Sequence, residues 1–244
     1  VDISKQFNSQ VSDIFKNFYL SPRSPYTTLE IPVHGIGEWC HPEFMATIDE
    51  SVMRKKVTGG ILNVGISGGI PFRFPQTGRN IVYTSLWDNY PDAVEIPLSG
   101  NASHAYLLLA GSTNYMQSRI DNGMITVTYT DGTTDVLPLQ NPHNWCPIEQ
   151  DYYEDGLAFH AASPRPFRLD FATLKVSREL MPMGERYGYQ QRDFAKGAGV
   201  ILDMPLHPQK TLRSLTVRTL SNDIVIGLMG ITLQRPTEKQ KNLE

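Results

Sequence analysis

The sequence predicts an all-β protein, a β-sandwich of jelly-roll type with one short helix near the N-terminus. Many short apolar runs of strand length are separated by turn residues, and 17 prolines and 19 glycines punctuate the chain. Apolar residues at helical spacing occur only close to the start. Numerous short strands with few helices are typical of antiparallel sandwiches and jelly rolls.

The one helical pattern covers residues 9–18. Its apolar residues recur every three or four positions, as on one face of an amphipathic helix, and the Ser-Pro pair that follows would end it. This face is expected to pack against the rest of the protein. The positions concerned are Phe7, Val11, Ile14, Phe15 and Phe18.

No internal repeat, low-complexity segment or linker is visible, so a single domain is the simplest organisation. We expect an N-terminal helical or extended arm over residues 1–30 that packs on the sandwich. The sandwich domain should span residues 31–234, and residues 235–244 should form a polar tail.

The clearest element is a β-hairpin over "GMITVTYTDGTTDVLPL" (123–139). Apolar residues alternate with threonines in "ITVTYT", which is the pattern of a half-buried strand. Asp131-Gly132 would supply the two positive φ angles of a type I′ turn. A two-residue loop places Val127 opposite Val136, so the apolar side chains of both strands should lie on one face.

Further strands are predicted from apolar runs between turn signals. The runs "HAYLLLAG" (104–111) and "DIVIGLMGITL" (223–233) are apolar on both faces and should be central strands. The remaining runs are "NIVYTS" (80–85), "AVEIPL" (93–98), "PFRLDFATL" (166–174), "GVILDMPL" (199–206) and "LRSLTVRTL" (212–220).

The charge and hydropathy of the chain limit which classes of binding partner are expected. The 244 residues carry a net charge of −3, which gives no electrostatic reason to expect nucleic acid or an anionic membrane. The longest apolar runs are too short to cross a bilayer. The chain opens "VDISKQ" without an initiator Met or a signal-peptide pattern, which fits a mature secreted chain or a piece of a longer protein. We expect a periplasmic or extracellular location.

Two cysteines, Cys40 and Cys146, occur in similar contexts, "GEWCHPE" and "HNWCPIE". A disulfide between them is one reading, and a metal site with His41 and His143 is another. We favour two buried, reduced and metal-free thiols, because no short-spaced ligand pair is present. No cofactor is expected, and the sequence leaves a structural cation open.

A succession of motifs resembles known proteins. "GGIPFRF", "GRNIVYTS", "VEIPLSGNASHAYLLLAGST", "VTYTDGTTDVLPL" and "NPHNW" follow one another between residues 68 and 145. This order resembles the galactose-binding-like jelly-roll modules attached to bacterial glycoside hydrolases. The longer string is similar to an uncharacterised family of gut Gram-negative bacterial proteins that are grouped with glycosyl hydrolases. The resemblance implies the fold and a glycan-processing context, and it transfers no catalytic residue.

Glycoside hydrolysis requires two carboxyl groups that flank the scissile bond. Six carboxylates stand in aromatic-rich loops, and nothing in their spacing pairs any two of them. We therefore expect no catalysis by this chain alone; if it is an enzyme, Glu149 and Asp151 are the best candidates. The six are Glu38, Glu43, Asp88, Asp92, Glu149 and Asp151.

Sugar binding needs an exposed aromatic ring beside groups that bond hydroxyls. For the three tryptophans, Trp39, Trp87 and Trp145, we favour a buried role at the ends of the sandwich. In the stretch 141–156 Trp145 should anchor the loop, and at least one of two tyrosines should turn outward. The predicted ligand-binding residues are Tyr152, Tyr153, Glu149, Asp151, Trp87, Tyr90, Tyr187, Tyr189 and Arg192.

These patterns together predict a non-catalytic ancillary module of a glycan-degrading protein, which binds carbohydrate or buttresses a catalytic domain of the same polypeptide. A self-contained carbohydrate hydrolase that uses loop carboxylates is the first alternative. A structural or protein-interaction module is the second.

Overall fold

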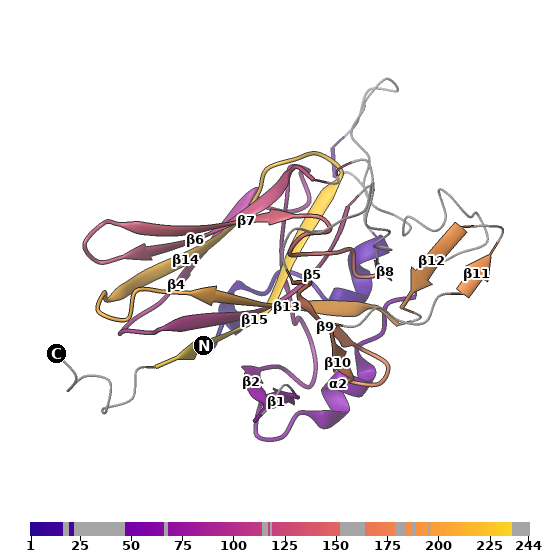
Figure 1. Cartoon of the computed structure of the whole chain (residues 1–244), viewed down its shortest axis with the longest axis horizontal. Helices are drawn as coiled ribbons and strands as arrows, with labels where there is room; N and C mark the ends of the chain where they lie inside the picture. The colour runs from indigo at the N-terminus through magenta and orange to yellow at the C-terminus, as the bar shows by residue number, and fades with distance from the viewer. Residues whose placement is uncertain are drawn as a thin grey trace.

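The computed structural model describes residues 1–16, 20–21, 47–65, 68–113, 117, 119–151, 164–178, 184–186, 189–194 and 196–235. Strands dominate, and they form an all-β sandwich of antiparallel sheets (Figure 1). No helix among these residues has the length and apolar character to cross a membrane.

Two large sheets make the sandwich. The six-stranded sheet has the order β10-β9-β13-β5-β15-β3, and the four-stranded sheet has the order β4-β14-β6-β7. The six strands are β10 (Val176–Ser177), β9 (Phe167–Asp170), β13 (Ala198–Pro205), β5 (His104–Thr113), β15 (Ile224–Gln234) and β3 (Val82–Ser85). The four are β4 (Ala93–Pro97), β14 (Leu212–Thr219), β6 (Asp121–Tyr129) and β7 (Thr134–Gln140).

Smaller elements surround the sandwich. Among the described residues, two short sheets have the orders β1-β2 and β11-β12-β8, and three short helices occur before residue 57. They are η1 (Ser4–Gln6), η2 (Val11–Lys16), α2 (Ser51–Lys56), β1 (Ile61–Val64), β2 (Ile70–Arg73), β8 (Gln150–Asp151), β11 (Gly184–Arg186) and β12 (Tyr189–Asp193).

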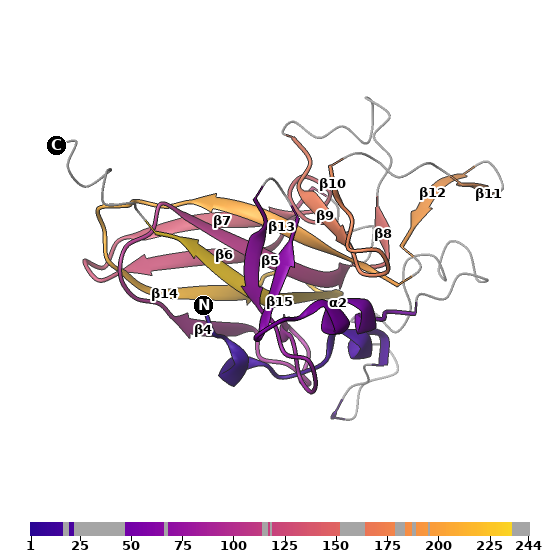
Figure 2. The same cartoon turned by 90° about the horizontal axis from the view of Figure 1, so that it is seen from below.

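Both faces of the six-stranded sheet are buried. On β5, Leu107 and Leu109 point into the core between the two large sheets, whereas Leu108 and Ala110 point into a second core. This second core is covered by η2, α2 and the β1-β2 hairpin, which Figures 1 and 2 show on the side away from the four-stranded sheet. The two runs predicted to be central, β5 and β15, are adjacent inner strands, which confirms that prediction.

The N-terminal segment contributes to both cores. Ile3 and Phe7 lie in the core between the sheets, and Val11 and Ile14 lie in the second core. The predicted helix over 9–18 is a six-residue 3-10 helix at Val11–Lys16 instead of an amphipathic α-helix. A residue outside the helix binds its first residue: the Asn80 side chain accepts the Val11 N–H at 2.8 Å.

The predicted hairpin forms, but its loop is longer by one residue. The Tyr129 N–H donates to the Thr133 carbonyl at 2.9 Å, and Gly132 N–H donates to the Tyr129 carbonyl at 3.0 Å. Residues 130–132 therefore form a three-residue loop in which Gly132 takes a φ of +84°, as in a type I turn with a G1 bulge. The type I′ prediction was wrong because Asp-Gly suits both loops.

One extra loop residue reverses which face of β7 is buried. Val127 lies opposite Asp135, and Val136 lies opposite Thr126 on the solvent face, 50% exposed. Asp135 consequently turns inward, where it accepts the Tyr129 hydroxyl and approaches the His207 ring. Burial and then the Asp135 hydrogen bond raise the pKa of Tyr129 to about 12.

One edge of the four-stranded sheet is β7. Pro138 has no N–H, and its carbonyl accepts the Asn144 side-chain amide at 2.7 Å. The same Asn144 side chain accepts the Gln140 N–H at 2.8 Å. One asparagine thus occupies backbone groups near the end of this edge strand.

Candidate functional site

The stretch from 141 to 149 packs into the protein instead of leaving it as a free loop. Trp145 is 1% exposed in the core between the sheets, and its indole N–H donates to Asn122 at 3.0 Å. Its ring lies so close to β5 that a Cβ on Gly111 would be 3.1 Å from it. Trp145 anchors this segment, as predicted.

Glu149 is wholly buried, so it does not offer its carboxylate to a surface ligand. Its backbone carbonyl accepts the Phe194 N–H at 3.0 Å, and the Ser112 hydroxyl lies 3.2 and 3.3 Å from the two carboxylate oxygens. The preceding residue, Ile148, bonds Gly111 on β5 at 2.7 Å and Ala198 on β13 at 2.7 Å. The prediction that Glu149 is an accessible ligand is corrected here, because these bonds draw the segment against the sheet.

The predicted ligand residues Trp87 and Tyr90 also pack against the protein, whereas Asp88 and Asp92 beside them are exposed. Trp87 is 2% exposed in the second core. Tyr90 is half-buried, its ring centroid is 5.2 Å from that of Tyr83, and its hydroxyl donates to Ser9 at 3.4 Å. Burial raises the pKa of the Tyr90 phenol. The exposed role predicted for Trp87 is therefore not found; the ring serves the core, as we favoured for tryptophans.

The structure describes only some of the other predicted ligand-binding residues. The backbone pairing of β8 with β12 sets Asp151 directly opposite Arg192, so these two candidates share a sheet. Tyr189 lies on the same strand as Arg192, and it is paired with Arg186. Tyr152, Tyr153 and Tyr187 lie outside the described residues, as do Trp39 and Cys40. Cys146 is buried.

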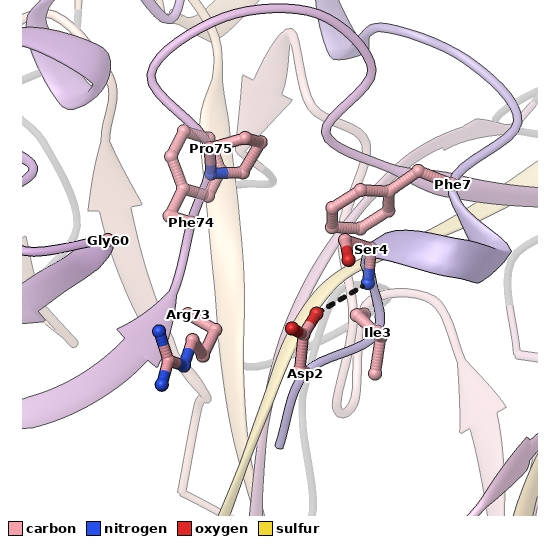
Figure 3. A pocket seen from close by; sticks show the side chains of 8 residues that line it. All are labelled: Asp2, Ile3, Ser4, Phe7, Gly60, Arg73, Phe74 and Pro75. Atoms are coloured by element: carbon pink, nitrogen blue, oxygen red, sulfur yellow. Dashed lines mark hydrogen bonds between the residues drawn. The ribbon is translucent and has the colours of Figure 1, made fainter.

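A pocket that the sequence did not indicate lies between the N-terminal segment and the end of β2 (Figure 3). Its volume is about 150 Å³. Ile3, Phe7 and Phe74 are buried and give it an apolar base, whereas its polar residues stand at an exposed rim. The lining residues are Asp2, Ile3, Ser4, Phe7, Gly60, Arg73, Phe74 and Pro75.

The rim carries an acceptor on one side and a donor on the other. Asp2 accepts the Ser4 N–H at 3.0 Å, and hydrogen bonds from the Ser4 backbone and hydroxyl lower the pKa of the Asp2 carboxyl, with a smaller contribution from Arg73. Asp2 is therefore ionised at neutral pH. Arg73, at the end of β2, presents a guanidinium on the opposite side. A ligand between them can both donate and accept hydrogen bonds.

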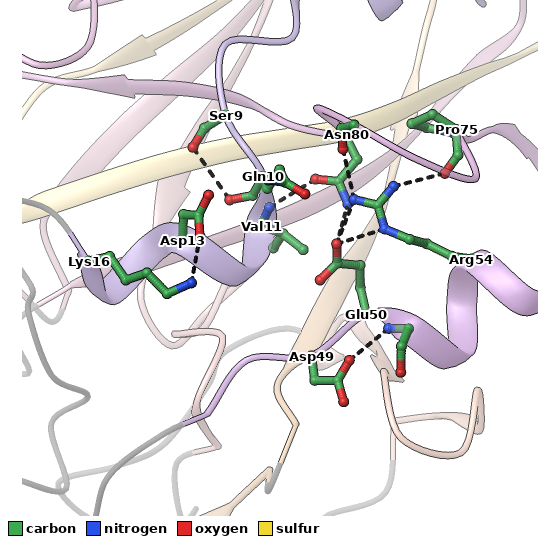
Figure 4. Close-up of polar contacts among 12 residues, drawn as sticks. Ser9, Gln10, Val11, Asp13, Lys16, Asp49, Glu50, Arg54, Pro75 and Asn80 are labelled. Carbon is green, nitrogen blue, oxygen red and sulfur yellow. Dashed lines mark hydrogen bonds and ion pairs between the residues drawn. The ribbon is translucent and has the colours of Figure 1, made fainter.

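A buried polar network holds the Pro75 wall of this pocket (Figure 4). Arg54 on α2 donates to Glu50 at 2.9 and 2.7 Å and to the Pro75 carbonyl at 3.3 Å. Glu50 is 4% exposed, and the same carboxylate oxygen accepts Asn80 at 3.0 Å. Since Asn80 also binds Val11, the network joins α2, the 75–80 loop and the N-terminal segment.

A second exposed polar group lies on the six-stranded sheet. His104 bonds Asp203 on β13 at 2.7 Å, and its ring stacks near Tyr106, with centroids 6.1 Å apart. The Tyr106 hydroxyl donates to Gln234 on β15 at 3.0 Å. These groups bond one another and line no pocket described here, so they are a weaker candidate than the pocket.

Metal chemistry finds no support in the described part of the chain, where no three His, Cys, Asp or Glu side chains gather closely enough to hold an ion. Comparison of the chain with protein-family models, curated proteins and solved structures gives no match.

Proposed function

We propose that this chain is a non-catalytic carbohydrate-binding module, and that the pocket between the N-terminal segment and β2 holds one sugar residue. The observation that supports it is the pairing of an apolar base with an ionised carboxylate and a guanidinium at the rim. A pyranose ring has an apolar C–H face and a girdle of hydroxyls, which such a site complements. Phe7, Phe74 and Pro75 supply apolar surface, and Asp2 and Arg73 supply polar partners.

The proposal includes a wider setting. The sandwich is of the jelly-roll, galactose-binding-like type, works in the periplasm or outside the cell, and serves a catalytic domain of a glycan-degrading protein. Two facing antiparallel sheets and the order of motifs over 68–145 support this reading.

Hydrolysis by the chain itself is less well supported. A glycosidase needs two carboxyl groups roughly 5–10 Å apart on either side of the bond. Asp2 is the only carboxylate among the described residues that line the pocket, and Glu149 is buried. A structural or protein-interaction module remains the second alternative.

Calorimetric or affinity-gel binding to a panel of plant and host glycans tests the proposal. Wild type should bind at least one glycan, and Asp2→Asn should weaken that binding, whereas Asp92→Asn should not, because Asp92 pairs with Arg218 at 2.7 Å outside the pocket. The double variant Tyr152→Ala/Tyr153→Ala tests the predicted loop platform. If that variant loses binding and Asp2→Asn keeps it, the pocket is not the site.

Activity is tested with the same panel. Turnover by the isolated chain that disappears in Glu149→Gln or Asp151→Asn would replace the module with the hydrolase alternative. Binding to no glycan on the panel would contradict the proposal and favour the structural role.

A further inference from the structure

The Arg73 guanidinium has hydrogen-bonding capacity that no described residue uses. Within the described part of the chain it forms neither a hydrogen bond nor an ion pair, and the residue is exposed. Its stem belongs to β2, where Arg73 lies opposite Ile61. One guanidinium nitrogen lies 3.4 Å from the position that a Cβ on Gly60 would take, so the hairpin backbone flanks the group.

Asp2 does not neutralise this guanidinium by contact. The Asp2 carboxylate is bonded to Ser4, and the influence of Arg73 on its pKa is smaller than that of the Ser4 hydrogen bonds. No ion pair joins Asp2 and Arg73 among the contacts described, although both line the pocket. The donor and the acceptor therefore stand apart, with room for a ligand between them.

A second arginine adds positive charge close by. Arg235 donates to the backbone carbonyls of Ser99 and Asn101 at 2.7 and 3.0 Å, and to no carboxylate in the described residues. Its field reaches the N-terminal segment, because Arg235 and then Arg73 lower the pKa of the Val1 amine after burial has done so. The two guanidinium charges outnumber the single Asp2 carboxylate, which favours an anionic ligand group.

We propose that the pocket recognises a sugar that carries a carboxylate, a uronic acid residue, with its carboxylate on the Arg73 guanidinium and a hydroxyl donating to Asp2. A guanidinium fork matches a carboxylate in a bidentate pair, which a neutral hydroxymethyl group cannot form. The sugar ring then lies against Pro75, which is the half-exposed apolar residue of the lining. This inference rests on the proposed function and names its ligand class.

Matched ligands provide the test. Galacturonate and glucuronate are compared with galactose and glucose by ligand-observed NMR and calorimetry at fixed ionic strength, with the intact chain. Each pair differs only at C6, where a carboxylate replaces a hydroxymethyl group. The uronates should bind about tenfold more tightly or better, as a charge-assisted bidentate contact predicts.

Three variants locate the effect. Arg73→Gln should abolish the preference for uronates, and Arg73→Lys should restore only part of it, since an ammonium keeps the charge and loses the planar fork. Arg213→Gln removes the same charge from an exposed position on β14, away from the pocket lining, and should leave the preference unchanged. Circular dichroism confirms that each variant is folded.

The outcomes are separable. Equal binding of uronates and neutral sugars, with loss in Asp2→Asn, overturns this inference and leaves the proposed function standing. A preference that Arg213→Gln reduces as much as Arg73→Gln reflects general charge attraction and also overturns it. Binding of none of the four sugars, and of no glycan on the panel, overturns both.

Discussion

The segment 141–149 and the N-terminal pocket contain similar kinds of side chain. In the segment the polar groups are hydrogen-bonded within the protein, whereas at the pocket some of them are accessible. In the segment, the Trp145 indole bonds Asn122 and the Glu149 carboxylate receives Ser112. At the pocket, no residue that the structure describes accepts a hydrogen bond from the Arg73 guanidinium. Aromatic and charged residues therefore indicate a binding site only where their hydrogen-bonding groups are not already paired within the protein.

The largest expected effect on stability is at Trp145, in the segment 141–149. Trp145→Ala should lower the free energy of unfolding by about 3–5 kcal/mol, because it leaves a cavity between the two sheets and deprives Asn122 of its donor. Urea denaturation measures it. Trp145→Phe retains most of the ring volume and should cost clearly less. A loss below about 1 kcal/mol in Trp145→Ala would show that the segment is not anchored as described.

The next effect concerns the network beneath the pocket. Glu50→Gln should destabilise the protein by about 2–3 kcal/mol, because the largely buried Arg54 guanidinium would lose its counter-charge. Since Arg54 also binds the Pro75 carbonyl, ligand affinity should fall together with stability. Denaturation and calorimetry report the two quantities. Asp13→Asn, at an exposed ion pair with Lys16, is the control and should change neither by a measurable amount.

A smaller effect is expected at the buried carboxylate. Ser112→Ala should cost about 1–2 kcal/mol, because it removes a hydroxyl donor from Glu149. Ser214→Ala is the matched control, since Ser214 is 4% exposed and its hydroxyl has no hydrogen bond among the described contacts. Equal losses in the two variants would mean that the Ser112 hydrogen bond contributes nothing beyond burial.

The smallest effect on stability is expected at the open rim. Asp2→Asn should change the free energy of unfolding at pH 7 by less than about 0.5 kcal/mol, because the carboxylate is exposed. Its folded pKa is lowered below the ordinary 3.8, so ionised Asp2 stabilises the protein above that pH, and this contribution is lost as the pH falls through the folded value. Denaturation at pH 7 and pH 3 should show that the free energy of unfolding falls less with acid in Asp2→Asn than in wild type. A large loss at pH 7 would mean that Asp2 is a structural residue.

Sequence reasoning located strands well and loops less well. The runs that became β5 and β15 could be identified because residues facing both cores must be apolar, which leaves a continuous hydrophobic stretch. The hairpin loop could not be settled, since Asp131-Gly132 fits two turn types and only the strand register decides between them. That single residue placed Val136 on the wrong face.

The candidate site could not be found from local patterns. Its residues come from 2–7, from Gly60 and from 73–75, and only the packing of the N-terminal segment beside β2 brings them together. The available signal was weak: "FRFP" alternates a charged residue with buried phenylalanines, which indicates an exposed arginine on a strand. The aromatic and acidic stretch 141–156 was misleading because its composition does not reveal that residues 145–149 are buried beside β5, where the Ile148 N–H bonds Gly111.

The Asn144 side chain, which bonds Pro138 and Gln140, also affects whether a strand of another chain can add to the β7 edge. An edge strand with unpaired backbone groups invites another strand to add to the sheet, which is a common beginning of aggregation. On β7 Pro138 offers no N–H, and Asn144 already binds the Pro138 carbonyl and the Gln140 N–H. An incoming strand therefore meets an interrupted hydrogen-bonding ladder at this edge. Addition of a strand to the sandwich through β7 is therefore unfavourable.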